Sequence, residues 1–407
     1  MPCGNWNWKW KPKAANGCAD GSSKSSKRRS NNRARFFPLG GRKAQHRRRE
    51  ELQLRTSFGV VLLQVWRGEN PADGRWGIPM RQRWGLLPHQ QLSPALEDKL
   101  AYFATVAGTY EMAARLARKV GIPIEDSTVR QLVQRLGARA EAQTQARLKT
   151  VPQEIHPERP GSALAVIMID GFQVRHRGPD WGKPEAVQPR VEWHEQKVGV
   201  FYHQDQNADG ELTEKVSVGW QGEPVDLGER LHWEAQRHAL GRARQTLAVC
   251  DGAPWPWHLI EARWQEAYQL LDFYHASQHL HTLAQALSPT DALARQQWVD
   301  QQCHDLRHGQ QKKVLQRLRQ LRRRRGAAGE TIRREKNYFE NHRQRLNYQE
   351  LSQRGWPIGS GPVESACGQR QRRFKRPGQF WTEKGLCYLN ALIEARDLDH
   401  WDSLWIN

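Results

Sequence analysis

The stretch Ala163-Leu-Ala-Val-Ile-Met-Ile-Asp170, which is followed by Gly171, decides the fold class expected for this chain. A continuous apolar run of this length is typical of a strand that is buried on both faces of a sheet. A second run, Leu247-Ala-Val-Cys250, ends in the same way at Asp251 and Gly252. An aspartate at the carboxyl end of a buried strand is held where ligands reach it. We therefore expect two buried strands that each present one carboxylate.

A third carboxylate has a different setting. Glu364 follows the glycine turn of Ile358-Gly-Ser-Gly-Pro-Val-Glu364 and precedes a helical, arginine-rich segment. Two strand-end aspartates and a helical glutamate would form a pocket of three hard oxygen ligands, which suits Mg²⁺ rather than Zn²⁺. Such a pocket predicts two-metal attack on a phosphodiester. For each aspartate alone, the alternative is a turn residue at the end of a strand.

The composition indicates the class of partner. The chain has 407 residues and a formal net charge of +20. This excess repels itself unless a polyanion neutralises it, so nucleic acid is the first partner expected and a membrane surface is the rival. No apolar stretch approaches the roughly 18 residues of a spanning helix. The six cysteines lack the spacing of a disulfide framework or a zinc ribbon, which indicates reduced thiols in the cytoplasm.

Composition and periodicity divide the chain. Residues 1–52 are rich in Ser, Gly, Asn, Lys and Arg, which predicts a disordered tail that contacts phosphates or, alternatively, only aids solubility. Two apolar runs between 58 and 80 predict a hairpin that turns near 70–74. Helical periodicity follows from 93 to 147. From 161 onward, strands that first cluster and then alternate with helices predict a mixed sheet covered by helices.

Two helices on either side of Gly121 predict a pair that reads DNA. The second helix, 128–136 with its end at Gly137, would present polar side chains to the major groove if the segment is a helix-turn-helix. The alternative is a plain helical bundle with a polar outer face. The side chains concerned are Thr128, Arg130, Gln131 and Gln134.

A basic helical block between 305 and 347 carries 14 Lys and Arg against 4 Asp and Glu. Successive arginines repel each other at a cost unless phosphates lie near, so we predict DNA contacts there rather than a merely solvated helix face. More positive charge follows Glu364, within reach of a DNA backbone bound there. The side chains predicted to contact DNA are Lys312, Lys313, Arg317, Arg319, Arg322 and Arg323 in the block, and Arg370, Arg372 and Arg373 after Glu364.

Four segments carry a resemblance to a known family. They are Ile169-Asp-Gly171, Cys250-Asp-Gly252, Leu271-Asp-Phe-Tyr-His275-Ala-Ser-Gln-His279-Leu280 and Pro357-Ile-Gly-Ser-Gly-Pro-Val-Glu364-Ser-Ala-Cys367, of which the last two are the more specific. From about 55 to 405 the chain resembles bacterial insertion-sequence transposases of the ISKra group, which have an RNase H-like DDE domain and Mutator-like relatives. The resemblance implies hydrolysis and strand transfer at insertion-sequence ends, with Asp170, Asp251 and Glu364 as catalytic ligands of two Mg²⁺ ions, or of Mn²⁺ as a substitute.

The resemblance also implies a multidomain α+β architecture. We expect an RNase H-like core in two parts, a mixed sheet flanked by helices, that an all-α insertion interrupts. The expected boundaries are 1–52 for the disordered basic tail, 53–90 for a β-hairpin region, 91–147 for a helix-turn-helix-like DNA-binding region, 148–160 for a linker, 161–280 and 356–407 for the two parts of the catalytic core, and 281–355 for the basic helical insertion. Unlike relatives with a cysteine-rich segment, the hairpin region here has no cysteine.

The expected partners are duplex DNA, as terminal repeats and target, and a second copy of the chain, in the cytoplasm and nucleoid of a bacterium. Asp272-x-x-His275 matches a motif of the Mutator-like relatives, and three roles stay open for His275 as a catalytic residue: it lies near the metals, contacts the scissile phosphate, or caps the following helix. Two other functions also stay open. One is a catalytically silent DNA-binding protein derived from such an element, and the other is an RNase H-like nuclease.

Overall fold

The structure, a computed structural model, describes residues 38–39, 42–87, 89–158, 161–204, 212, 215–322 and 324–405. The chain divides into two compact units, Met1–Pro94 and Ala95–Asn407. Most of the predicted basic tail, and Arg323, lie outside the described residues. Of the helices described, none combines the length and the apolar character that a membrane crossing requires.

The first unit contains a three-stranded antiparallel sheet. Strand β3 (Gln45–Thr56) turns through residues 57–58 into β4 (Gly59–Glu69), which also pairs with β5 (Trp76–Gly77). The remaining elements of the unit are β1 (Pro38–Leu39), β2 (Arg42–Lys43) and α2 (Pro79–Arg83). The predicted hairpin around 70–74 is confirmed, because β4 and β5 pair antiparallel on either side of that turn. The sequence did not predict β3, the long partner of β4, which begins inside the segment 1–52 expected to be disordered and has Leu52 as its one buried residue among those described.

The second unit begins with three helices, α3 (Pro94–Val106), α4 (Tyr110–Lys119) and α5 (Asp126–Arg147). Thr109 caps α4, since its Oγ1 accepts a hydrogen bond from the backbone N of Met112 at 3.0 Å. The helices occur where the sequence predicted them, but α5 does not end at Gly137. A Cβ at Gly137 would clash with the backbone oxygen of Tyr388 in α14 (Glu383–Asp397), so this glycine permits close helix packing rather than ending a helix.

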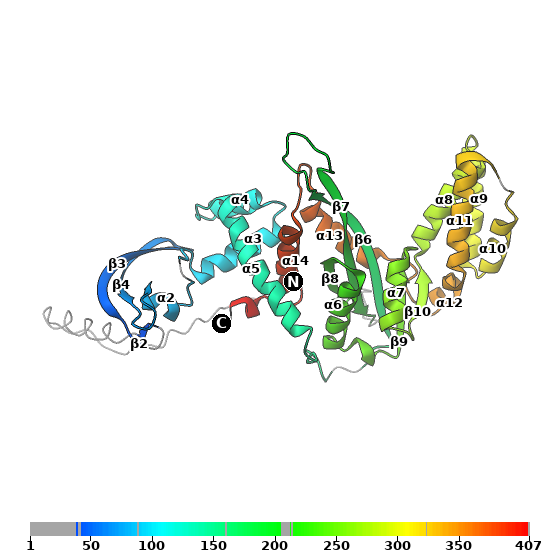
Figure 1. The fold of residues 1–407 in the computed structure, drawn as a ribbon. Helices are drawn as coiled ribbons and strands as arrows, with labels where there is room; N and C mark the ends of the chain where they lie inside the picture. The colour runs from blue at the N-terminus through cyan, green and yellow to red at the C-terminus, as the bar shows by residue number, and fades with distance from the viewer. Residues whose placement is uncertain are drawn as a thin grey trace. The chain divides into compact units, whose positions relative to one another are not determined.

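A five-stranded mixed sheet forms the core of the second unit, with the strand order β10-β9-β6-β7-β8 (Figure 1). Strands β6, β7 and β8 are antiparallel, whereas β9 and β10 run parallel to β6. All the residues from Leu164 to Ile169 are buried, which explains the unbroken apolar run. The strands are β6 (Leu164–Arg177), β7 (Val191–His203), β8 (Val216–Gln221), β9 (Gln245–Cys250) and β10 (Tyr268–Leu271).

Helices cover both faces of this sheet. Gly199 pairs with Val218, and a Cβ on Gly199 would meet Leu231 of α6 (Pro224–Arg237). Gly219, the next residue of β8, points to the opposite face, where a Cβ would meet Arg370 of α13 (Gly361–Phe374). Thus α6 and α13 lie on opposite faces of the sheet. Helix α7 (Pro254–Arg263) follows β9 and packs against it. The mixed, helix-flanked sheet is the fold class that the sequence predicted.

The segment between β10 and α13 is helical, as predicted. Helix α8 packs against α9 and α11, and α10 packs against both of these (Figure 1). This helical segment begins at Phe273, directly after β10 ends at Leu271 and Asp272 caps the first helix. The helices are α8 (Phe273–Leu287), α9 (Ala292–Arg307), α10 (Gln311–Gln320), α11 (Gly326–Asn341) and α12 (Tyr348–Gln353).

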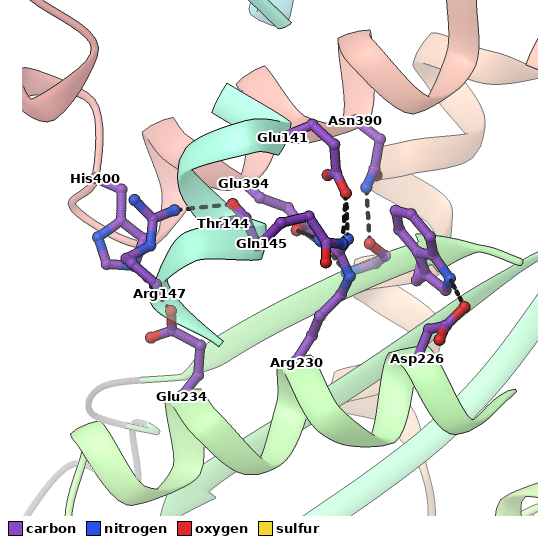
Figure 2. Close-up of polar contacts among 12 residues, drawn as sticks. Glu141, Thr144, Gln145, Arg147, Asp226, Arg230, Glu234, Asn390, Glu394 and His400 are labelled. Carbon is purple, nitrogen blue, oxygen red and sulfur yellow. Dashed lines mark hydrogen bonds and ion pairs between the residues drawn. The ribbon is translucent and has the colours of Figure 1, made fainter. Parts of the chain in front are cut away.

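A buried polar network protects the edge strand β8 and joins it to α5, α6 and α14 (Figure 2). The backbone N of Gly219 donates to Oε1 of Glu394 at 2.5 Å, and Nδ2 of Asn390 donates to the oxygen of Gly219 at 2.7 Å. Arg230 of α6 donates to Glu141 of α5 at 2.5 Å and lies 4.0 Å from Glu394. Two side chains of α14 thus occupy backbone groups that an open edge would leave free.

The stability of this network depends on pH. Burial raises the pKa of Glu394 to about 7, against the opposing effect of Arg230 and Arg370. A raised carboxyl pKa stabilises the folded state fully below the unfolded pKa near 4.5, and this stabilisation is lost as pH rises through about 7. Between pH 5 and pH 8 the unfolding free energy of the wild type should fall by roughly 3 kcal/mol more than that of Glu394→Gln. Urea unfolding of both proteins at the two pH values measures this difference. Parallel urea curves for the two proteins at every pH would contradict this.

Candidate functional site

Three aspartates lie in one row across three neighbouring parallel strands, at the level where β9 and β10 end. Ile169 of β6 pairs with Cys250 of β9, and Cys250 pairs with Leu271 of β10. One residue further along each strand are Asp170, Asp251 and Asp272. Neighbouring strands lie about 4.8 Å apart, so the register itself brings these residues to the same edge of the sheet.

Asp170 does not end its strand, which corrects the expectation from sequence. Strand β6 continues to Arg177, whereas its parallel neighbour β9 stops at Cys250. Asp170 therefore lies where β6 loses that neighbour, and its backbone is still paired with Val198 of β7. A notch in the sheet, rather than a strand end, makes the half-buried carboxylate accessible.

Asp272 is fully buried and accepts hydrogen bonds from the backbone at the N-terminal ends of two helices. Its Oδ1 accepts a hydrogen bond from the backbone N of His275 at 2.6 Å, and this caps α8. Its Oδ2 accepts a hydrogen bond from the backbone N of Ser360 at 2.5 Å. Because Ser360 directly precedes α13, Asp272 fixes the turn that places Glu364.

Glu364 lies exposed in the first turn of α13. The hydroxyl of Ser360 donates to its Oε1 at 2.9 Å, so Ser360 links Asp272 to Glu364. Asp272, His275 and Glu364 each offer a ligand atom, and these atoms lie within 4.8 Å of one another. Within the described part of the chain, this is the group of acidic, His and Cys side chains spaced closely enough to hold a metal ion. Asp170 and Asp251 lie outside that group.

The predicted ligands have little positive charge beside them. Burial raises the pKa of Asp170 above its ordinary value, and the neighbouring charge of Asp251 raises it further. Asp305 and Glu340 each pair with an arginine. Among the residues that the structure describes, no Lys or Arg forms an ion pair with Asp170, Asp251 or Glu364. A cation bound by these oxygens would relieve their repulsion, and the donor set fits Mg²⁺.

His275 lies beside this cluster. Its Nδ1 is 3.1 Å from Oδ1 of Asp272, and this hydrogen bond raises the pKa of His275 above its ordinary value. The charges of Asp251 and Asp170 raise that pKa further. Of the three roles left open by the sequence, helix capping belongs to Asp272, whose side chain makes the cap. The imidazole of His275 instead lies against Asp272, whose carboxylate favours the protonated form of the ring.

The helical insertion reaches the same edge through Tyr338, which sequence reasoning missed. A Cβ on Gly252 would clash with the Tyr338 ring, so the glycine after Asp251 allows α11 to approach. The Tyr338 ring stacks on His279 with centroids 3.6 Å apart, and Nδ1 of His279 lies 2.5 Å from Glu335. The buried hydroxyl of Tyr338 has no hydrogen-bond partner among the described residues. The motif Asp251-Gly252 carried part of this signal, but nothing in the sequence singles out Tyr338.

The predicted DNA-reading face of α5 is accessible, but other segments of the chain flank it. Arg130 and Gln131 are exposed, and Thr128 and Gln134 are half-buried. Arg130, Gln131 and Gln134 line a groove of about 940 Å³, whose other walls come from the start of α4, the loop 375–382 and Trp181. This face is therefore one wall of a groove rather than a free surface.

The basic residues of the insertion fall into two groups. Lys312, Lys313 and Arg322 are exposed. Arg317 donates to Asp305 and Gln302, and Arg319 makes a two-pronged pair with Glu340 at 2.8 and 2.9 Å. The internal partners of Arg317 and Arg319 compete with DNA for these guanidinium groups. We therefore expect Lys312, Lys313 and Arg322 to contribute more to DNA binding than Arg317 and Arg319.

Two arginines after Glu364 are not surface residues, and their assignment to a DNA surface is wrong. Arg370 is 4% exposed and donates to the hydroxyl of Ser217 in β8 at 2.8 Å. Arg373, also 4% exposed, donates to the backbone oxygens of Ala104 and Gly108. Both tie α13 to neighbouring elements, because every third or fourth position of a packed helix faces inward. Arg372 lies on the exposed side.

Comparisons with known proteins add little to this geometry. No protein-family model matches the chain, and no curated protein matches it. A solved structure, the Drosophila P element transposase strand transfer complex, is similar over 80% of this chain and 82% of that chain, at 12% sequence identity and a TM-score of 0.26. A TM-score this low supports no conclusion about fold or activity, so the function has to be inferred from the site.

Proposed function

We propose that this protein is a DDE transposase, similar to those of the ISKra group, that hydrolyses phosphodiesters and transfers strands at insertion-sequence ends. The observation that carries the proposal is the row of Asp170, Asp251 and Asp272, whose last member is linked to Glu364 through Ser360 and which forms no ion pair with a Lys or Arg among the described residues. A regulator without catalytic activity has no need of clustered carboxylates that repel one another.

The proposed ligands of two Mg²⁺ ions are Asp170, Asp251 and Glu364. Bound there, the ions would lower the pKa of the attacking water or 3′-hydroxyl and neutralise charge in the transition state. Asp272 orients Glu364 through Ser360 and holds His275 in place. His275 contributes positive charge next to the scissile phosphate. Mn²⁺ would substitute for Mg²⁺, because both accept oxygen ligands.

Duplex DNA is the proposed partner, both as element ends and as target. The support is the net charge of +20 and the exposed basic residues of the helical insertion, which follows directly from the strand that carries Asp272. Joining two element ends to one target requires two active sites, so we propose that at least two copies act together on DNA. A bacterial cytoplasmic location belongs to the same proposal.

The test is incision of a duplex that carries the sequences flanking this protein's own gene. We expect cuts at the end junction in Mg²⁺ or Mn²⁺ and none in EDTA. End-specific binding without incision in any metal would point instead to a silent DNA-binding derivative. Preferential cutting of the RNA strand in an RNA–DNA hybrid would point to an RNase H-like nuclease.

Charge removal on α10 provides a separate prediction. Replacing Lys312 and Lys313 by Gln is expected to weaken binding to every duplex sequence about tenfold and to lower the slope of log affinity against log salt by about 2. The measurement is a salt titration of DNA binding by fluorescence anisotropy. The matched control is the pair Lys99→Gln and Lys149→Gln, which removes equally exposed lysines outside the insertion. Equal effects of the two pairs would show that only net charge matters.

A further inference from the structure

The groove beside α5 is built from four segments of the second unit. Its walls are the outer face of α5, the start of α4, the loop 375–382 after α13, and the turn at Trp181 after β6. Its volume of about 940 Å³ suits a small ligand or a short strand. A helix that reads duplex DNA must itself enter the major groove, which is about 12 Å wide. The walls that flank this face of α5 oppose such docking.

Two guanidinium groups flank a pair of aromatic rings at one side of the groove. Arg175 lies 4.8 Å from the ring centre of Phe380, and Phe380 lies 4.6 Å from Trp181 at an interplanar angle of 47°. Arg177 continues the series 5.4 Å from the Trp181 ring. Trp181 remains 39% exposed, so an open aromatic face is available to a planar ligand. Every nucleic-acid base has a face that stacks on such a surface.

The groove is also positively charged. Arg130, Arg177 and Arg376 line it, and among the residues that the structure describes none of the three has a carboxylate within ion-pair distance. Of the two acidic residues in the lining, Glu111 pairs with Arg115 at 2.9 Å, which leaves Asp126. Stacking surfaces with unpaired arginines around them match an unpaired nucleic-acid strand, whose bases are free and whose phosphates carry negative charge.

The segments that carry Trp181 and Phe380 are both connected to β6, the strand that carries Asp170. The backbone N of Arg177 donates to the oxygen of Trp381 at 2.8 Å, and the N of Trp381 donates to the oxygen of Arg175 at 3.1 Å. Asp180, buried in the turn after β6, accepts hydrogen bonds from the backbone N of Val187 and Gln188. The positions of Trp181 and Phe380 are therefore fixed relative to the carboxylate edge.

The number of residues along β6 and α13 indicates how far the groove lies from the carboxylates. Asp170 and Arg177 are seven residues apart on β6, about 23 Å at ~3.3 Å per residue. Glu364 and Phe374 are ten residues apart on α13, about 15 Å at ~1.5 Å per residue. These distances correspond to about four to seven nucleotides at ~3.4 Å each, the rise along a stacked strand of duplex DNA.

We propose that the groove binds a short unpaired stretch of the DNA strand, about four to seven nucleotides from the phosphodiester at the carboxylates, with one base stacked on Trp181 and Phe380. The proposal rests on the proposed function and names the part of the substrate that α5 meets: unpaired bases, not the major groove of a duplex. The arginines Arg130, Arg177 and Arg376 hold the phosphates of this stretch.

The test compares a blunt duplex with the same duplex carrying a single-stranded tail of about four nucleotides. Binding is measured in EDTA, and a 2-aminopurine in the tail reports stacking through its fluorescence. We expect Trp181→Ala to weaken binding of the tailed duplex about 5- to 100-fold and to abolish the quenching of 2-aminopurine, while binding of the blunt duplex changes less than about twofold. Phe380→Leu should act in the same direction.

The matched control is Tyr268→Ala on β10, because Tyr268 is 40% exposed, as Trp181 is. Equal losses for blunt and tailed duplexes in Trp181→Ala would overturn the proposal in favour of duplex reading by α5. Unchanged binding of the tailed duplex would also overturn it. Incision of the blunt duplex by the wild type is measured in parallel. If the wild type neither binds nor cuts DNA, the proposed function itself fails, whereas binding and cutting without tail preference refutes the groove alone.

Discussion

Replacing Glu364 by Gln is expected to reduce Mg²⁺-dependent incision at least about 10³-fold, while DNA affinity measured in EDTA stays within about twofold. The substitution keeps the shape of the side chain and an oxygen that accepts the hydrogen bond from Ser360. It removes the negative charge that a divalent cation needs from its ligand. Loss of an outer partner of a metal site typically costs 10- to 100-fold, so loss of a ligand should cost more. The measurement is single-turnover cleavage beside a binding titration.

Glu383→Gln is the matched control for this substitution. Glu383, like Glu364, is an exposed glutamate in the first turn of a helix, but it lies in α14. We expect Glu383→Gln to cut DNA at the wild-type rate. If Glu364→Gln also cuts at that rate, Glu364 is not a metal ligand. The close group of Asp272, His275 and Glu364 then takes no part in catalysis.

The local pattern predicted the sheet well because the signal is physical and short-ranged. A short unbroken apolar run such as 164–169, rich in β-branched residues and followed closely by a glycine, favours a strand covered on both faces. The row of Asp170, Asp251 and Asp272 follows from register, which a single sequence does not encode directly. The motif around Asp272 marked that residue, but its full burial and its bond to Ser360 depend on a turn 88 residues away.

The predictions from sequence were wrong where the role of a residue depends on tertiary packing, which local composition does not show. Arg370 and Arg373 lie in a run of basic residues that resembles a DNA contact, yet the face of α13 that meets β8 and α3 buries both. Gly137 resembles a helix stop, but the approach of α14 requires it. The polar face of α5 fits a DNA-reading helix, and only the fold reveals the walls of the groove around it. In each case the partner segment lies far away in sequence.

Arg230→Met is expected to destabilise the second unit by about 3–5 kcal/mol, because it removes one partner from a buried charge network. Arg230 is 3% exposed, donates to Glu141 at 2.5 Å and stacks 3.7 Å from the centre of the Trp220 ring. Without it, the half-buried Glu141 lies near the buried Glu394 (Figure 2). Arg370, 4.0 Å from Glu394, is then the remaining cation. The measurement is the urea midpoint followed by circular dichroism.

Two further variants separate network charge from packing. Adding Glu141→Gln and Glu394→Gln to Arg230→Met should restore most of the lost stability, because neutral amides do not need the arginine, whereas a loss due to packing against Trp220 would persist. Arg115→Met removes an arginine from the exposed pair with Glu111 and should cost less than about 1 kcal/mol. If Arg230→Met costs no more than Arg115→Met, the buried network does not hold α5 and α14 against β8. The edge strand must then be protected by apolar packing and by the hydrogen bonds of Asn390 and Glu394 to Gly219.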